Sequence, residues 1–199
     1  MNSIKNIPGE KGCLCLLEKY STPEHIVRHS QKVWEVGKFL GESMIERNHK
    51  IDLPLLRASC LLHDIGKFPC ILSGAKNHDM MGKEILEKEG LPSVGEIISQ
   101  HVILKGPKNR SISEEHIVFY ADKRVVHDEI VSLENRFVYL LNTYGKSLGA
   151  IERLLVMKQD TINVENAIFE ILKLDPEVIS SSTMCNPSKT ESSRKQQVR

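Results

Sequence analysis

Apolar residues return every three or four positions along most of the chain, which is the spacing of one face of an α-helix. The first long helix is predicted from Thr22 to about Arg47, with a capping hydroxyl, a proline and an acid at its start. Asp52 caps a second helix, in which residues 55–62 are apolar almost throughout. This segment should therefore be the most buried helix.

Further helical segments follow the same spacing, and turn residues separate them. Gly66 and Pro69 are expected to end the second helix and to begin a loop that runs through Gly74. The later helices are predicted at residues 78–89, at 93–101, from Ser113 past Asp122, from Ser132 onward and at 161–174, with a loop at Gly106-Pro107. No stretch alternates between apolar and polar residues as a strand does, so the predicted fold class is all-α.

The composition changes near the C-terminus. From Ser180 the sequence SSSTMCNPSKTESSRKQQVR has little apolar content and no face that could pack. Such a segment cannot bury enough surface to offset its loss of chain entropy. We therefore expect one helical domain over residues 1–178 and a disordered tail over residues 179–199.

Charge and cysteine content exclude several classes of protein. The 199 residues carry a net charge of +1, so we expect neither a polymeric nucleic acid nor a membrane surface as partner. No apolar run reaches the length of about 20 residues that a membrane span needs, and the first ten residues do not resemble a signal peptide. The five cysteines form no disulfide framework, which favours a cytoplasmic protein, and Cys13 and Cys15 are interpreted as apolar fillers of a helix.

Histidine and aspartate residues carry the chemistry of the sequence. An ionised Asp64 at the end of the most apolar helix needs a compensating cation, because burial and the helix dipole both disfavour its charge. Imidazoles and carboxylates together are typical ligands of divalent metals. A core histidine, or a surface ion pair of Asp122 with Lys123 or Arg124, would explain single members of the set but not their combination. The candidate metal ligands, in chain order, are His29, His63, Asp64, His78, His101 and Asp122. The other histidines, His25, His49, His116 and His127, are assigned to the surface.

The run His63-Asp64-Ile65-Gly66-Lys67 within this order resembles the HD-domain superfamily of metal-dependent phosphohydrolases, and its HDIG-type members in particular. The resemblance covers about residues 20–140 and implies an all-helical bundle. It also implies two divalent ions (Mn, Fe, Mg, Co or Zn) that Asp64 bridges. One ion would bind His29, His63 and Asp122, and the other would bind His78 and His101.

The resemblance implies attack of metal-activated water on a small phosphoester or phosphoanhydride, most simply a nucleotide. Asp64 and Lys67 are the candidate catalytic residues, and Lys67 and Arg136 are the candidates for holding phosphate. Two alternative interpretations stay open, in which Lys67 pairs with the dipole at a helix C-terminus and Arg136 is a surface residue. Lys105 and Arg124 are weaker candidates for holding phosphate. The six-ligand order is shared with symmetrical diadenosine tetraphosphate hydrolases. The chain lacks the GYP element of cyclic di-GMP phosphodiesterases and a second domain like that of (p)ppGpp hydrolase-synthetases.

Two other functions use similar residues. A metal- and nucleotide-binding regulatory module without turnover is the main alternative to an enzyme. An oxygenase with iron in the same site ranks lower, because the HDIGK sequence and the nearby bases suit phosphate.

Overall fold

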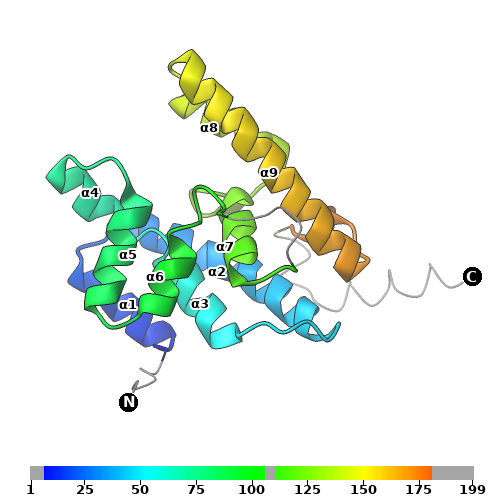
Figure 1. The fold of residues 1–199 in the computed structure, drawn as a ribbon, viewed down its shortest axis with the longest axis horizontal. Helices are drawn as coiled ribbons and strands as arrows, with labels where there is room; N and C mark the ends of the chain where they lie inside the picture. Colours follow the sequence, from blue (N-terminus) through cyan, green and yellow to red (C-terminus); the bar gives the residue numbers. More distant parts are fainter. Residues whose placement is uncertain (1–6, 106–110, 181–199) are drawn as a thin grey trace, which may run out of the picture.

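A computed structural model describes residues 7–105 and 111–180 of the chain, and their regular secondary structure is helical apart from one very short hairpin (Figure 1). The helices are α1 (Glu10–Lys19), α2 (Glu24–Ile45), α3 (Leu53–Leu62), α4 (Lys67–Ser73), α5 (His78–Lys88), α6 (Pro92–Ile98), α7 (Glu114–Lys123), α8 (Leu133–Tyr144) and α9 (Leu148–Leu172). The antiparallel hairpin pairs β1 (Val125–Val126) with β2 (Glu129–Ile130), and a 3₁₀ turn, η1 (Pro176–Val178), follows α9.

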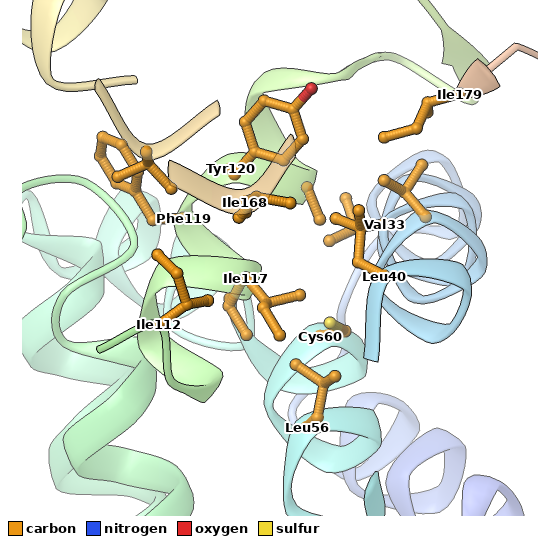
Figure 2. Packing of buried hydrophobic residues seen from close by; sticks show 14 of the residues in the cluster. Val33, Leu40, Leu56, Cys60, Ile112, Ile117, Phe119, Tyr120, Ile168 and Ile179 are labelled. Carbon is orange, nitrogen blue, oxygen red and sulfur yellow. The ribbon is translucent and has the colours of Figure 1, made fainter. Parts of the chain in front are cut away.

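The main core lies between α2, α3, α7 and the C-terminal part of α9. Figure 2 shows Leu40 and Val33 of α2 facing Cys60 and Leu56 of α3, with Ile117 of α7 beside them. These five side chains are fully buried. Removing this apolar surface from water is the main stabilising term for such a bundle.

A second core lies on the other side of α3, where α1, α5 and α6 pack. Leu61 and Leu62 at the end of α3 and Ile65 in the turn after it form one apolar cluster with Leu86 of α5 and Val94 of α6 there. The helix α3 is thus covered on both sides, and residues 58–66 are all buried. The prediction that α3 would be the most buried helix is wrong in detail, because seven of the ten residues of α7 are buried against six of ten in α3. The burial of residues 58–66 nevertheless places His63 and Asp64 in the interior.

The helices α8 and α9 form an antiparallel hairpin whose tip stands away from the rest of the molecule (Figure 1). Phe137, Leu140 and Leu154 form a small core of their own inside the hairpin. At its base, Arg124 donates to the Tyr120 hydroxyl at 2.6 Å and to the carbonyl oxygen of Ile179 at 2.8 Å. Ile179 is buried, so packing continues to the end of the described chain.

Most predicted helices are present, and their starts often match. The side chain of Asp52 caps α3 by accepting from the amide of Leu55, as expected. Thr22 is not a helix cap, because Pro23 occupies that position of α2. Cys13 is buried in α1, but Cys15 is exposed, so only the first is an apolar filler.

Three other expectations were wrong in detail. The expected loop after Gly66 contains the helix α4, with Pro69 in its first turn, where proline is tolerated. The last helix begins at Leu148 rather than near residue 161. The hairpin of β1 and β2 was not predicted, because strands of two residues show no alternation. The predicted loop at residues 106 and 107 and the tail from residue 181 lie outside the described residues. Within the described residues, no helix is both long and apolar enough to span a membrane.

Candidate metal centre

The six candidate ligands come from distant parts of the sequence and meet at one place inside the bundle. His29 lies in α2, Asp122 lies near the end of α7, and the pair His63-Asp64 lies in the turn that follows α3. The other two ligands, His78 and His101, lie at the start of α5 and after the end of α6, respectively. Five of the six are at most 7% exposed, and His78 is half-buried.

The first group of ligands gathers around one oxygen of Asp64. Nε2 of His63 lies 3.2 Å from Asp64 Oδ2, and Nε2 of His29 lies 3.9 Å from the same oxygen. Asp122 Oδ1 completes the group, at 3.0 Å from His29 Nε2 and 3.8 Å from His63 Nε2. These spacings leave donor atoms close enough to share one cation.

The second group gathers around the other oxygen of Asp64. Nε2 of His78 and Nε2 of His101 each lie 3.6 Å from Asp64 Oδ1, and the two ring nitrogens lie 3.1 Å from each other. Within each of the groups His29–His63–Asp64 and Asp64–His78–His101, the donor atoms lie within 4.8 Å of one another. Asp64 is therefore the member that the two groups share, with one oxygen toward each.

Backbone carbonyl groups fix the orientation of three of the imidazoles. Because a carbonyl oxygen can only accept, each Nδ1 must donate, and a neutral ring then has a bare lone pair on Nε2. These Nδ1 contacts are His29 to the His127 oxygen at 2.8 Å, His63 to the Cys60 oxygen at 2.8 Å, and His101 to the Ile98 oxygen at 2.6 Å. A lone pair that faces a carboxylate is repelled unless a proton or a cation lies between them. Such hydrogen bonds on the far nitrogen are typical of histidines that bind metals.

The buried polar atoms of the centre are incompletely satisfied. Neither oxygen of Asp64 nor Nε2 of His63 has a donor or acceptor in hydrogen-bonding geometry among the described residues. Burial alone would raise the pKa of Asp64, but His63 and Lys67 outweigh it and hold this pKa well below its usual range. Asp64 is thus an ionised carboxylate in the interior, and neither of its oxygens is satisfied by a hydrogen bond among the described residues. The nitrogen and oxygen donors suit Mn, Fe, Mg, Co or Zn alike.

Comparison with known proteins identifies the family. The HD domain family matches residues 26–125, which are 100 of the 199 residues. The chain belongs to the HD domain family. The match spans α2 to β1 and contains all six candidate ligands, and the family is one of metal-dependent phosphohydrolases. No solved structure matches the chain significantly.

Three curated relatives are archaeal. A protein named tRNA (cytidine(56)-2'-O)-methyltransferase from Thermoplasma volcanium is 34% identical over 100 residues, which cover 50% of this chain and 27% of that protein. A protein of the same name from Picrophilus torridus is 26% identical and matches 89% of this chain, but only 48% of its own length. An uncharacterized protein of Methanocaldococcus jannaschii is 24% identical, with 71% of this chain and 90% of that protein covered. The chain thus spans about a quarter and about half of the two named relatives.

Asp122 is not in the surface ion pair that would have explained it alone. It is 6% exposed, and its neighbour Lys123 is 3% exposed. Burial would raise the pKa of Asp122, but Lys123 and Arg136 hold it well below the usual range. Arg136 is 9% exposed and lies 3.3 Å from Asp122 Oδ1, so it is part of the HD centre rather than a surface residue.

Lys67 also faces the centre. It begins α4, so the alternative of a lysine at a helix C-terminus does not apply. Its Nζ lies 2.6 Å from Asp64 Oδ2 as an ion pair, although the contact is not aligned as a hydrogen bond. Burial lowers the pKa of Lys67, but Asp64 and Asp122 outweigh this and raise it.

A cavity of about 480 Å³ opens onto Asp64. Lys67 and Arg136, which were predicted to hold phosphate, both line it, and so does Lys76. The cavity also contains three residues that the sequence analysis did not assign to the site, namely Lys76, His25 and His127. The lining also includes apolar and aromatic side chains, namely those of Ile71, Tyr139, Leu140 and Tyr144.

The weaker basic candidates do not reach the cavity. Arg124 is buried in its contacts with the C-terminal segment, and Lys105 is exposed and does not line the cavity. Of the histidines assigned to the surface, His127 is exposed, as expected, but its carbonyl oxygen orients His29. A backbone contact of this kind has no signal in the sequence.

Proposed function

We propose that this chain is a phosphohydrolase that uses two divalent ions to cleave a small phosphoester or phosphoanhydride, and that its substrate is a nucleotide. The convergence of imidazole Nε2 atoms on the two oxygens of Asp64 carries this proposal, because it provides donors on both sides of one buried carboxylate. The HD family supports the same class of reaction.

The two ligand groups fit the proposed ions. His29, His63 and Asp122 would hold one ion, and His78 and His101 would hold the other. Asp64, whose two oxygens each face one group, would be the ligand common to both. When bound, such a pair of ions supplies Lewis acidity, which lowers the pKa of water and draws charge from phosphoryl oxygens.

The protein's own basic residues would hold the phosphate. Lys67 is 39% exposed and faces the cavity, so its ammonium can turn from Asp64 toward a phosphate oxygen once a cation neutralises Asp64. Arg136 lines the cavity, and its guanidinium donates to Asp122 Oδ1 at 3.3 Å. A guanidinium in a cavity lining suits a phosphate oxygen, because it presents several donors in one plane.

The aromatic side chains of the cavity lining support a nucleotide rather than a bare phosphate. The ring of Tyr139 lies beside that of His127, at 5.5 Å between ring centroids and nearly perpendicular. Tyr144 is 59% exposed beside it, so its ring is available to a planar ligand. A cavity of about 480 Å³ is in the range of small-ligand sites. The net charge of +1 gives no basic track for polymeric nucleic acid.

A regulatory module without turnover is the second candidate. In the two relatives named as methyltransferases, the matched region is only 27% and 48% of a protein named for another activity. A region attached to an enzyme can bind a ligand and control its neighbour. The ligand set of this chain is complete, which favours catalysis.

A substrate panel tests both candidates. The protein is stripped with chelator, reloaded with Mn, Fe, Mg, Co or Zn, and given nucleoside mono- and polyphosphates, dinucleoside polyphosphates and p-nitrophenyl phosphate. We expect release of phosphate or a nucleotide by the wild type and none by Asp64→Asn or His63→Ala. Glu96→Gln, which removes an exposed carboxylate paired with Lys83, is the matched control and should keep full activity. Measurable nucleotide binding without turnover for every metal would replace the enzyme by the regulatory module.

A further inference from the structure

Lys123 is a buried lysine that contacts both ligand groups of the centre. It follows Asp122 directly in α7 and is 3% exposed, which is rare for a lysine unless its charge is paired. Its Nζ donates to Asp122 Oδ2 at 2.8 Å and to the carbonyl oxygen of His101 at 2.7 Å. The ring of Phe119, one turn earlier in α7, lies 4.7 Å from the same nitrogen.

The contact with Asp122 orients its carboxylate. Because Oδ2 is engaged by Lys123, Oδ1 is the oxygen that faces Nε2 of His29 at 3.0 Å. A carboxylate that is bonded at one oxygen cannot turn about its terminal torsion without losing that bond. Arg136 contacts Oδ1 at 3.3 Å, and Lys123 holds Oδ2, so Lys123 helps to present Oδ1 of Asp122 to the first group.

The contact with His101 acts through the backbone. His101 lies beyond the end of α6, in a bend where its carbonyl oxygen has no place in a regular helix. The residue is 2% exposed, so this oxygen needs a donor from the protein. Lys123 is that donor, and it fixes the peptide from which the imidazole of the second group extends.

We propose that Lys123 is a positioning residue that joins the two ligand groups, so that one ammonium sets both Asp122 and His101 for metal binding. The proposal rests on the proposed two-metal function. It predicts a change in metal affinity opposite to the change that the charge of Lys123 alone would cause. An ammonium next to a cation site repels the cation, so the charge of Lys123 by itself weakens metal binding. Removing a lysine that only contributes charge should strengthen metal binding, whereas removing one that positions ligands should weaken it.

Three lysine-to-methionine variants separate these outcomes. Mn²⁺ binding is measured by titration calorimetry and by metal analysis after equilibrium dialysis, without substrate. We expect Lys123→Met to weaken the binding of both ions about 10–100-fold, which is the usual effect of losing a residue that orients metal ligands. Lys67→Met removes the other ammonium beside a ligand carboxylate and should bind Mn²⁺ equally or more tightly. Lys158→Met, in an exposed pair with Glu134, should leave binding unchanged. Binding by Lys123→Met that is as tight as or tighter than in the wild type would overturn the proposal.

The fold of each variant is checked by circular dichroism and by thermal unfolding in chelator. If Lys123 had only a structural role, its replacement would lower the unfolding midpoint in chelator. The Mn²⁺ affinity of the folded protein and the added stability that Mn²⁺ gives would then be unchanged. If Lys123→Met does not fold, Lys123→Gln takes its place, because a glutamine keeps polar donors but lacks the charge and the reach. Wild-type affinity in Lys123→Gln would refute the positioning role. Because the binding measurement needs no substrate, a protein that hydrolyses no phosphoester would refute the proposed enzyme and not this role.

Discussion

Replacing Asp64 by asparagine should abolish the stabilisation by divalent ions and leave the metal-free fold intact. The two side chains have the same shape, and Asp64 is 1% exposed, so the substitution creates no cavity. In the metal-free protein it removes both the cost of burying a carboxylate and the ion pair with Lys67 at 2.6 Å, and these effects largely offset each other. In the metal-bound protein it removes the carboxylate that the two groups share within the described part of the chain.

The size of the effect follows from mass action. An ion present at a hundred times its dissociation constant stabilises the folded state by about 2.7 kcal/mol. For a domain of 150–250 residues, 1 kcal/mol corresponds to about 2–4 °C in the unfolding midpoint. Each ion should therefore raise the wild-type midpoint by about 5–11 °C, and two ions should raise it by about twice as much.

Differential scanning calorimetry with chelator and with Mn²⁺ measures this increment directly. We expect a large increment for the wild type and for Glu96→Gln, and almost none for Asp64→Asn, with the three midpoints in chelator within a few degrees of one another. An equal increment in Asp64→Asn and the wild type would show that ions bind elsewhere. A wild type with no increment would show that no tight site exists.

Four further substitutions test other parts of the centre. His78→Ala and His101→Ala should each lose one ion and keep the other in metal analysis, and a wild type that never binds more than one ion would contradict the two-metal arrangement. Lys67→Met should raise KM for a phosphoester while two ions remain bound, so an unchanged KM would argue against its contact with phosphate. Gly66→Ala should lower stability by about 1–3 kcal/mol or more in denaturant unfolding, because its Cβ would overlap the carbonyl oxygen of His78. Gly9→Ala, which meets no neighbouring atom, is the control and should be harmless.

The sequence predicts helices well where one face is buried and the other is polar. The segment from Glu24 to Ile45 is such a case, because Val33 and Leu40 are fully buried while Lys38 is exposed. The N-terminal part of α9 is not. It packs on α8 but stands away from the body, and Leu148, Leu155 and Val156 are exposed on it. Because apolar residues lie on both faces of this part of α9, they do not show the spacing of a single buried face. Only the C-terminal half of α9, which packs on the main core, was predicted as a helix.

In the metal centre, too, some residues could be predicted from the sequence and others could not. Side chains that bind metals can be recognised by type, so the order of histidines and aspartates suggested which residues to bring together. The groups that orient them cannot be recognised in this way. The carbonyl oxygen of His127 contacts His29 only because a tight hairpin, with His127 at a φ of 54°, brings it there. Lys123 looks like an ordinary base beside Asp122 until the fold buries it.

The glycine of the HDIG sequence explains how two ligand groups come to share one carboxylate. The turn after α3 carries Asp64, and Gly66 lies in the same turn, packed against the backbone at the start of α5. A residue with a side chain at this position would hold the two segments apart, because its Cβ would occupy the place of the His78 carbonyl oxygen. His78 is the first residue of α5, and its Nε2 lies 3.6 Å from Asp64 Oδ1. Close backbone contact at Gly66 is therefore what places the second ligand group beside the first, and a motif that reads as four consecutive residues specifies a distance between two helices.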